Sequence, residues 1–124
     1  MMRSRSLNNK VLGNAFEAEI CEFFAKNGWW VHFIAPAANG GQPFDIIAVK
    51  GGTAIAGDCK TSIKPIFPIT RLEQNQIFAF ERWIAAGNTM PRVFIKYKNR
   101  AYSVPYEMLK REGSVEIESQ EILY

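Results

Sequence analysis

Three residues of the sequence have types and spacing suited to phosphate chemistry: Asp45, Asp58 and Lys60. Asp58 and Lys60 are two positions apart in an apolar segment, so both side chains point to one side if that segment is a strand. Two carboxylates hold a hard divalent cation such as Mg²⁺, and a lysine beside that cation can orient a water molecule. The pattern therefore predicts metal-assisted hydrolysis of a phosphodiester.

The spacing of the two acids also predicts that they face each other. Residues 44–50 and 53–61 are apolar strand-like segments, and Gly51-Gly52 between them is a signal for a two-residue hairpin. If these glycines form the loop, Lys50 pairs with Thr53, and the same register places Asp45 opposite Asp58. Facing side chains have Cβ atoms about 4.5–5.5 Å apart, where like charges destabilise a sheet. We therefore expect a bound cation to compensate the two acids.

A simpler interpretation needs no metal. Lys60 could neutralise one acid as an ion pair at the end of the sheet, which is the usual role of an isolated Asp-x-Lys pattern in a strand. The pairing of Asp45 with Asp58 favours the metal site, but a shift of the register by one residue would separate the two acids. Both interpretations stay open on the sequence alone.

The remaining segments predict the elements that must position these residues. Apolar periodicity, turn residues and capping signals define them. We expect a helix from about Lys10 to Asn27, a strand over 29–35, an extended segment over 63–69, a helix from Thr70 to Gly87 with a Thr70–Glu73 capping box, strands over 92–97 and 101–104, and a short helix after Pro105. This order predicts an α/β fold with one mixed sheet of about five strands flanked by helices.

The two motifs resemble those of a known superfamily. Pro43-Phe44-Asp45 and Asp58-Cys59-Lys60 are similar to the motifs of the PD-(D/E)-x-K nucleases. The resemblance implies a restriction-endonuclease-like core, a Mg²⁺ cofactor for which Mn²⁺ substitutes, metal binding by both acids and a catalytic role for Lys60.

A glutamate on the first helix often joins the site in this superfamily. Helical periodicity places Glu17 and Glu19 at opposite edges of the apolar stripe and does not choose between them. The segment from Gly13 to Glu17 resembles the G-x-x-x-E pattern, which selects Glu17 as a third acid at the metal.

Segments further along the chain resemble Holliday-junction resolvases. Phe67-Pro68-Ile69 and Asn75-Gln76-Ile77 are similar to RecU-type resolvases, in which a glutamine follows the active-site hairpin. The resemblance implies that Gln76 bonds a water or a phosphate at the site, although an ordinary exposed helix residue fits the pattern equally. The Gly51-Gly52 turn is too short for the stalk of RecU-type proteins, and archaeal resolvases, which lack the stalk, are the alternative comparison. Two symmetric cuts imply a homodimer, for which exposed aromatic side chains would supply the interface.

The composition is consistent with DNA as the binding partner. The chain has 124 residues, is 48% hydrophobic and has a net charge of +3. Its last residues are acidic, so residues 1–106 hold 13 basic and seven acidic side chains. A basic body favours a polyanion. We expect one nuclease domain over residues 1–124, with 1–9 as a flexible basic leader. The candidate phosphate contacts are Arg3, Arg5, Lys10, Lys64 and Arg71.

The same features indicate location and leave two further functions open. No apolar segment is long enough to cross a membrane and the two cysteines form no disulfide framework, so we expect a cytoplasmic protein, of a size that suits a phage or mobile element. Another DNA nuclease of the superfamily, of restriction or repair type, would use the same residues. A non-catalytic DNA-binding module is the third hypothesis, but such a module gains nothing from two facing buried acids.

Overall fold

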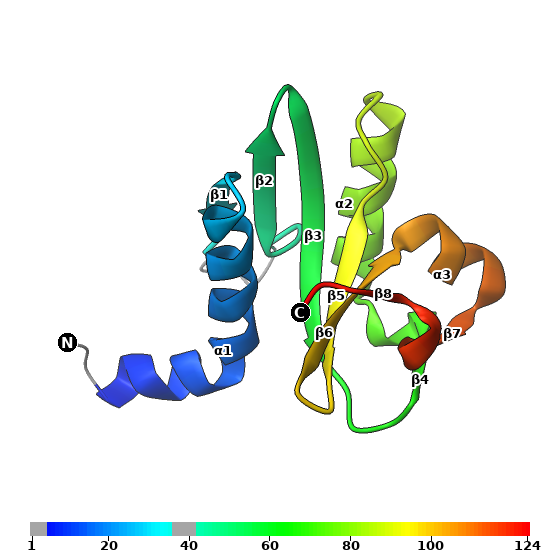
Figure 1. Cartoon of the computed structure of the whole chain (residues 1–124). Helices are drawn as coiled ribbons and strands as arrows, with labels where there is room; N and C mark the ends of the chain where they lie inside the picture. Colours follow the sequence, from blue (N-terminus) through cyan, green and yellow to red (C-terminus); the bar gives the residue numbers. More distant parts are fainter. Residues whose placement is uncertain (1–4, 36–41) are drawn as a thin grey trace.

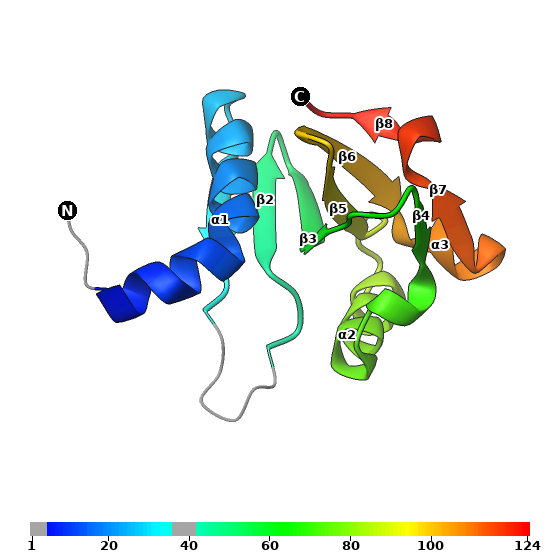
Figure 2. The same ribbon diagram turned by 90° about the horizontal axis from the view of Figure 1, so that it is seen from below.

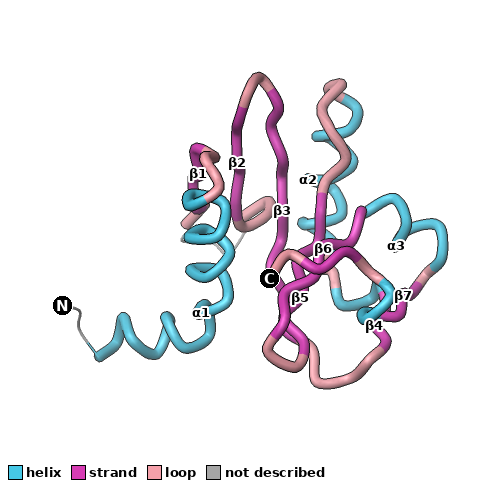
Figure 3. The backbone as a smooth tube through the Cα atoms, viewed as in Figure 1, coloured by secondary structure: helices cyan, strands magenta, loops and turns pink. Residues whose placement is uncertain are grey.

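A central six-stranded sheet organises the computed structural model, which describes residues 5–35 and 42–124. Its strand order is β1-β2-β3-β5-β6-β8 (Figure 1), and β4 pairs with β7 in a separate two-stranded ladder (Figure 3). The elements are α1 (Arg5–Lys26), β1 (Trp30–Phe33), β2 (Ile46–Lys50), β3 (Thr53–Thr61), β4 (Ile66–Pro68), a 3₁₀ turn η1 (Ile69–Arg71), α2 (Gln74–Ala85), β5 (Arg92–Tyr97), β6 (Arg100–Pro105), α3 (Tyr106–Glu112), β7 (Ser114–Glu116), a 3₁₀ turn η2 (Ile117–Ser119) and β8 (Glu121–Ile122).

Helices cover both faces of the sheet (Figure 2). On one face, Phe16, Ile20 and Phe24 of α1 pack against Ile46 and Ala48 of β2. The opposite face is covered by α2, α3 and the β4–β7 ladder. Strands β3 and β5 are parallel neighbours, and a parallel pair needs a long crossover. The segment that makes this crossover contains α2, which places the start of α2 close to the end of β3.

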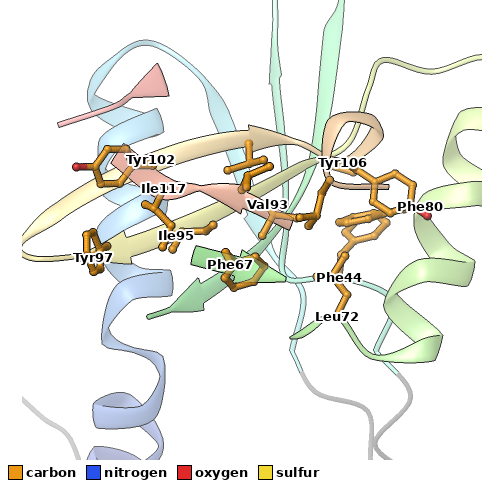
Figure 4. Close-up of a cluster of buried hydrophobic side chains, with 14 residues drawn as sticks. Phe44, Phe67, Leu72, Phe80, Val93, Ile95, Tyr97, Tyr102, Tyr106 and Ile117 are labelled. Carbon is orange, nitrogen blue, oxygen red and sulfur yellow. The ribbon is translucent and has the colours of Figure 1, made fainter. Parts of the chain in front are cut away.

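An aromatic cluster joins α2 to the sheet (Figure 4). Phe44 stacks on Phe80 of α2 with ring centroids 5.9 Å apart, and Phe80 contacts Tyr106 at 5.1 Å. All three side chains are at most 6% exposed, so the contact removes a large apolar area from water. Phe44 directly precedes Asp45, and this packing therefore fixes the position of the first acid.

The predicted hairpin register is confirmed from the turn to Ile46. Lys50 pairs with Thr53 and Ile46 pairs with Gly57, which is the last pair of the ladder. The Asp45 backbone N–H donates to the Gly57 carbonyl, one residue out of this register, so the expected direct pair of Asp45 with Asp58 is not formed. Strand alternation over residues 44–50 would place Phe44 and Ile46 on one face, but a bend at Asp45 interrupts the alternation and the two side chains lie on opposite faces. Phe44 packs with α2, whereas Ile46 packs with α1.

Several helices and strands differ from their predicted number or bounds. The class of fold is confirmed, but the main sheet has six strands instead of about five, because the final segment adds β8 to its edge. Helix α1 begins at Arg5, within the segment expected to be a flexible leader, and residues 1–4 lie outside the described part of the chain. Within residues 5–35 and 42–124, no helix is long and apolar enough to cross a membrane.

The predicted start of the second helix is wrong. Residues 69–71 form η1, and α2 begins at Gln74 with Glu73 as its N-cap. The capping box joins Glu73 to Gln76 instead of Thr70 to Glu73. Buried Leu72, which stays extended between the two helical segments, explains why the Thr70 spacing does not open the helix.

Candidate active site

The end of the β2–β3 hairpin brings the two predicted acids together inside the protein. Asp45 is 5% exposed and Asp58 is fully buried. The Asp45 backbone N–H donates to the Gly57 carbonyl over 3.0 Å, which ties Asp45 to β3 next to Asp58. At Gly57 a Cβ atom would overlap the Phe94 ring of β5, so glycine permits the close packing of β3 on β5 beside Asp58.

Both oxygens of the Asp45 carboxylate accept hydrogen bonds. The Gln42 side-chain amide donates to Oδ1 over 2.8 Å, and the Cys59 backbone N–H donates to Oδ2 over 2.8 Å. Hydrogen bonds to a carboxylate are charge-assisted and comparatively strong. The orientation of Asp45 is therefore fixed by the strand opposite and by the loop that precedes β2.

Asp58 is contacted from two sides. Gln76 Nε2 donates to Asp58 Oδ1 over 3.2 Å, and the Lys60 ammonium lies 3.4 Å from Oδ2. The capping box explains the orientation of the Gln76 amide. Its Oε1 accepts the Glu73 backbone N–H over 2.8 Å, so its NH₂ group is the end that faces Asp58. Gln76 is buried, and the interpretation of it as an ordinary exposed helix residue is wrong.

The structure separates the two candidate glutamates of α1. Glu17 is partly buried and interacts with Asp45 and Lys60. Glu19 lies at the other edge of the helix, where it accepts hydrogen bonds from Lys96 over 2.5 Å and from the Tyr124 hydroxyl over 2.8 Å. The Lys96 bond chiefly holds the pKa of Glu19 below its usual value. Of the two glutamates, only Glu17 therefore stands beside the pair of acids.

Two oxygens of this acid cluster are buried without a hydrogen-bond partner in the part of the chain that is described: Glu17 Oε1 and Asp58 Oδ2. Burial, followed by the neighbouring Asp45 carboxylate, raises the pKa of Glu17 to about 8. The same two causes raise the pKa of Asp58 to about 8, against the opposing effect of Lys60. Negative charge is therefore under-compensated at this point, as expected where a cation binds.

The donor set fits a hard divalent cation that retains part of its hydration. Among the described residues, no three His, Cys, Asp or Glu side chains form a ready metal cage. Mg²⁺ does not require such a cage, because one or two carboxylates with waters and substrate phosphate oxygens complete its octahedron. Asp45, Asp58 and Glu17 supply carboxylate oxygens, and the two unpartnered ones are available for this role.

Of the basic residues predicted to contact DNA, the structure describes the side chains of two. Arg71 lies in η1; its Nη2 donates to the Thr61 carbonyl over 2.8 Å, and its guanidinium covers the Phe67 ring at 5.1 Å. Lys64 is exposed in a turn after β3, where the Ser62 hydroxyl bonds both its N–H and its carbonyl. Arg5 and Lys10 belong to α1, but their side chains lie outside the described set, as does all of Arg3.

Sequence reasoning missed Gln42 and the Cys59 backbone N–H as partners of Asp45. No motif marks Gln42, which follows the loop of residues 36–41 that is not described. The Cys59 N–H lies beyond the last pair of the hairpin ladder, so the register alone does not identify it. The only sequence signal for Gln42 is its position three residues before the candidate acid Asp45.

Two comparisons relate the chain to known proteins. The sequence model of the archaeal Holliday junction resolvase family (Hjc) matches residues 8–122. Among solved structures, Hjc of Archaeoglobus fulgidus, a Holliday junction resolvase from an archaeal hyperthermophile, is similar with a TM-score of 0.71 and 19% sequence identity. That match covers 89% of this chain and 95% of the other. A comparison with curated proteins finds no match.

Proposed function

The chain belongs to the archaeal Holliday junction resolvase family and is a nuclease of four-way DNA junctions, and we propose that it cuts them by Mg²⁺-dependent hydrolysis at the Asp45–Asp58 pair. The buried and unpartnered acid oxygens beside Lys60 carry this proposal. The family is the archaeal one, which was the alternative to the RecU type and agrees with the short Gly51-Gly52 turn.

Asp45, Asp58 and Glu17 would hold the Mg²⁺ ion, with Mn²⁺ as a substitute. When bound, the ion would lower the pKa of a water molecule and stabilise negative charge on the phosphate. Lys60, which is 16% exposed, directs its ammonium at the edge of the acid cluster and orients the attacking water there. Gln76 keeps Asp58 in place through Oδ1, and Oδ2 faces the Lys60 ammonium.

DNA contacts extend from the site along the segment after β3. Lys64 and Arg71 are exposed, and Arg71 is held in position by Thr61 and Phe67 before any phosphate arrives. Each ion pair with a phosphate releases counterions, so it contributes to the salt dependence of binding. Substrate DNA and two free cysteines agree with a cytoplasmic location.

Replacing Lys64 or Arg71 with alanine is expected to weaken junction binding and to reduce the slope of log K against log salt by about one. Fluorescence anisotropy at several salt concentrations measures this slope. Lys110→Ala is the matched control, because Lys110 lies on α3 and pairs with Glu81 at 2.8 Å. Equal slopes for all three variants would contradict the proposal that Lys64 and Arg71 contact DNA phosphates.

A homodimer would supply two active sites for the two symmetric cuts. We place its interface on the outer face of α2, where Phe78 is 59% exposed. Phe78 lines a shallow groove of about 480 Å³ together with Pro43, Arg82 and Trp83. An exposed apolar groove of this kind is a typical site of self-association.

The decisive experiment compares cleavage of a labelled four-way junction with cleavage of a linear duplex of the same sequence. We expect paired symmetric cuts in the junction with Mg²⁺, none in EDTA, and a dimer mass in sedimentation that falls with Phe78→Asp. Glu17→Gln should lose activity, whereas Glu19→Gln on the same helix should keep it. Equal cutting of the linear duplex would favour a restriction or repair nuclease, and junction binding without any cutting would favour a non-catalytic module.

A further inference from the structure

Gln42 is bonded to a site acid although no catalytic motif includes it. Its side-chain amide donates to Asp45 Oδ1 over 2.8 Å, opposite the Cys59 N–H that donates to Oδ2. An ionised carboxylate has about four lone-pair positions. Each of the two hydrogen bonds uses one lone pair, one on each oxygen, and together they fix the plane of the carboxylate. The lone pairs that remain therefore point in a fixed direction.

Gln42 is itself held by the first turn of α2. Asn75 Nδ2 donates to the Gln42 backbone carbonyl over 2.6 Å. The next residue, Gln76, donates to Asp58. Two consecutive amide side chains of α2 therefore reach the two acids, Gln76 directly and Asn75 through Gln42.

We propose that Gln42 and Asn75 are positioning residues, which hold Asp45 in the orientation that binds the metal; this inference rests on the proposed function. The amide is uncharged, so it orients the carboxylate and leaves the charge of the site to attract the cation. Groups that orient metal ligands in this way typically change metal affinity or activity by 10–100-fold when they are removed.

Because Asp45 is only 5% exposed, the carboxylate has little access to water as a replacement donor. Loss of the Gln42 amide would therefore leave Oδ1 free to rotate toward Lys60 or away from Asp58. A purely structural role predicts something different: lower stability of the metal-free protein without any specific change in metal affinity.

The test measures Mn²⁺ binding by isothermal titration calorimetry without DNA, and unfolding by urea in EDTA. We expect Gln42→Ala to weaken Mn²⁺ binding by about 10–100-fold. Asn75→Ala should weaken it less, and the double variant should resemble Gln42→Ala, because both residues act through the same contact. Gln74→Ala, an exposed neighbour on α2, is the matched control and should bind as the wild type does.

Mn²⁺ affinity of Gln42→Ala within twofold of the wild type would overturn the inference, as would an equal loss in Gln74→Ala. If Gln42→Ala does not fold, Asn75→Ala decides, since it removes a donor without touching Asp45. The proposed function fails separately: a wild type that binds Mn²⁺ but leaves junctions intact contradicts the nuclease mechanism and not the positioning role.

Discussion

Asp58→Asn is expected to abolish junction cleavage and, at the same time, to stabilise the metal-free protein above neutral pH. Cleavage should fall by about 10³-fold or more, beyond the 10–100-fold typical of groups that only orient a ligand. Stability should rise because Asp58 is fully buried, and the cost of burying its charge exceeds the opposing effect of the Lys60 ammonium 3.4 Å from Oδ2. An uncharged amide at this position removes a buried charge and can still accept the Gln76 hydrogen bond.

The same carboxyl predicts a distinct dependence of stability on pH. Burial raises its pKa from an ordinary value of 3.8 to about 8 in the folded protein. Between these values the unfolded chain releases a proton that the folded protein keeps, so the free energy of unfolding falls as pH rises. Glu17, raised from 4.5 to about 8, acts in the same direction. In EDTA we therefore expect stability to decline from about pH 4 to pH 8.

Urea denaturation in EDTA at pH 5, 7 and 9 measures this effect. The difference in unfolding free energy between Asp58→Asn and the wild type should grow with pH. Glu118→Gln, which removes an exposed carboxylate far along the chain, is the control and should show a constant difference. Added Mg²⁺ should raise the free energy of unfolding of the wild type but not that of Asp58→Asn, because metal binding competes with protons for the same oxygens. A pH-independent difference would contradict the raised pKa.

Lys60→Met is expected to slow cleavage by about 10²–10³-fold, the range for loss of one group that stabilises charge in a transition state. Methionine keeps the length of the side chain and removes only the ammonium that lies 3.4 Å from Asp58 Oδ2. The Lys60 side chain is 16% exposed and lies beside the fully buried Asp58, so its loss should affect the rate of the bound complex much more than junction binding.

Single-turnover cleavage with saturating protein separates these two effects. Lys64→Met provides the matched control, because it removes the same charge four residues away on an exposed turn. The control should raise the protein concentration needed for half-saturation and leave the maximal rate unchanged. If both variants lower the maximal rate equally, Lys60 acts through general charge, and its proposed role in orienting water would be wrong.

Local signals in the sequence determined the core of the site. Gly51-Gly52 fixes the hairpin turn and the register from Lys50–Thr53 to Ile46–Gly57, which brings Asp45 to the end of β2 beside Asp58 and Lys60 of β3. The amphipathic first helix, the β3 segment and the hairpin of β5 and β6 are likewise local patterns, and the structure has each of them. Such features could be predicted because their geometry depends on residues close together in the chain.

Tertiary structure alone decided how the site is completed. The motif resemblance selected Glu17 but helical periodicity did not, and packing supplies the physical reason: Lys96 of β5 and Tyr124, both distant in sequence, bond Glu19. The start of α2 depends on the burial of Leu72, and it sets the Glu73–Gln76 box that aims Gln76 at Asp58. Gln42 bonds Asp45, and its carbonyl accepts a hydrogen bond from Asn75, 33 residues away on another element. A sequence pattern specifies which side chains share a strand or helix face, whereas the contacts between separate elements depend on how those elements pack.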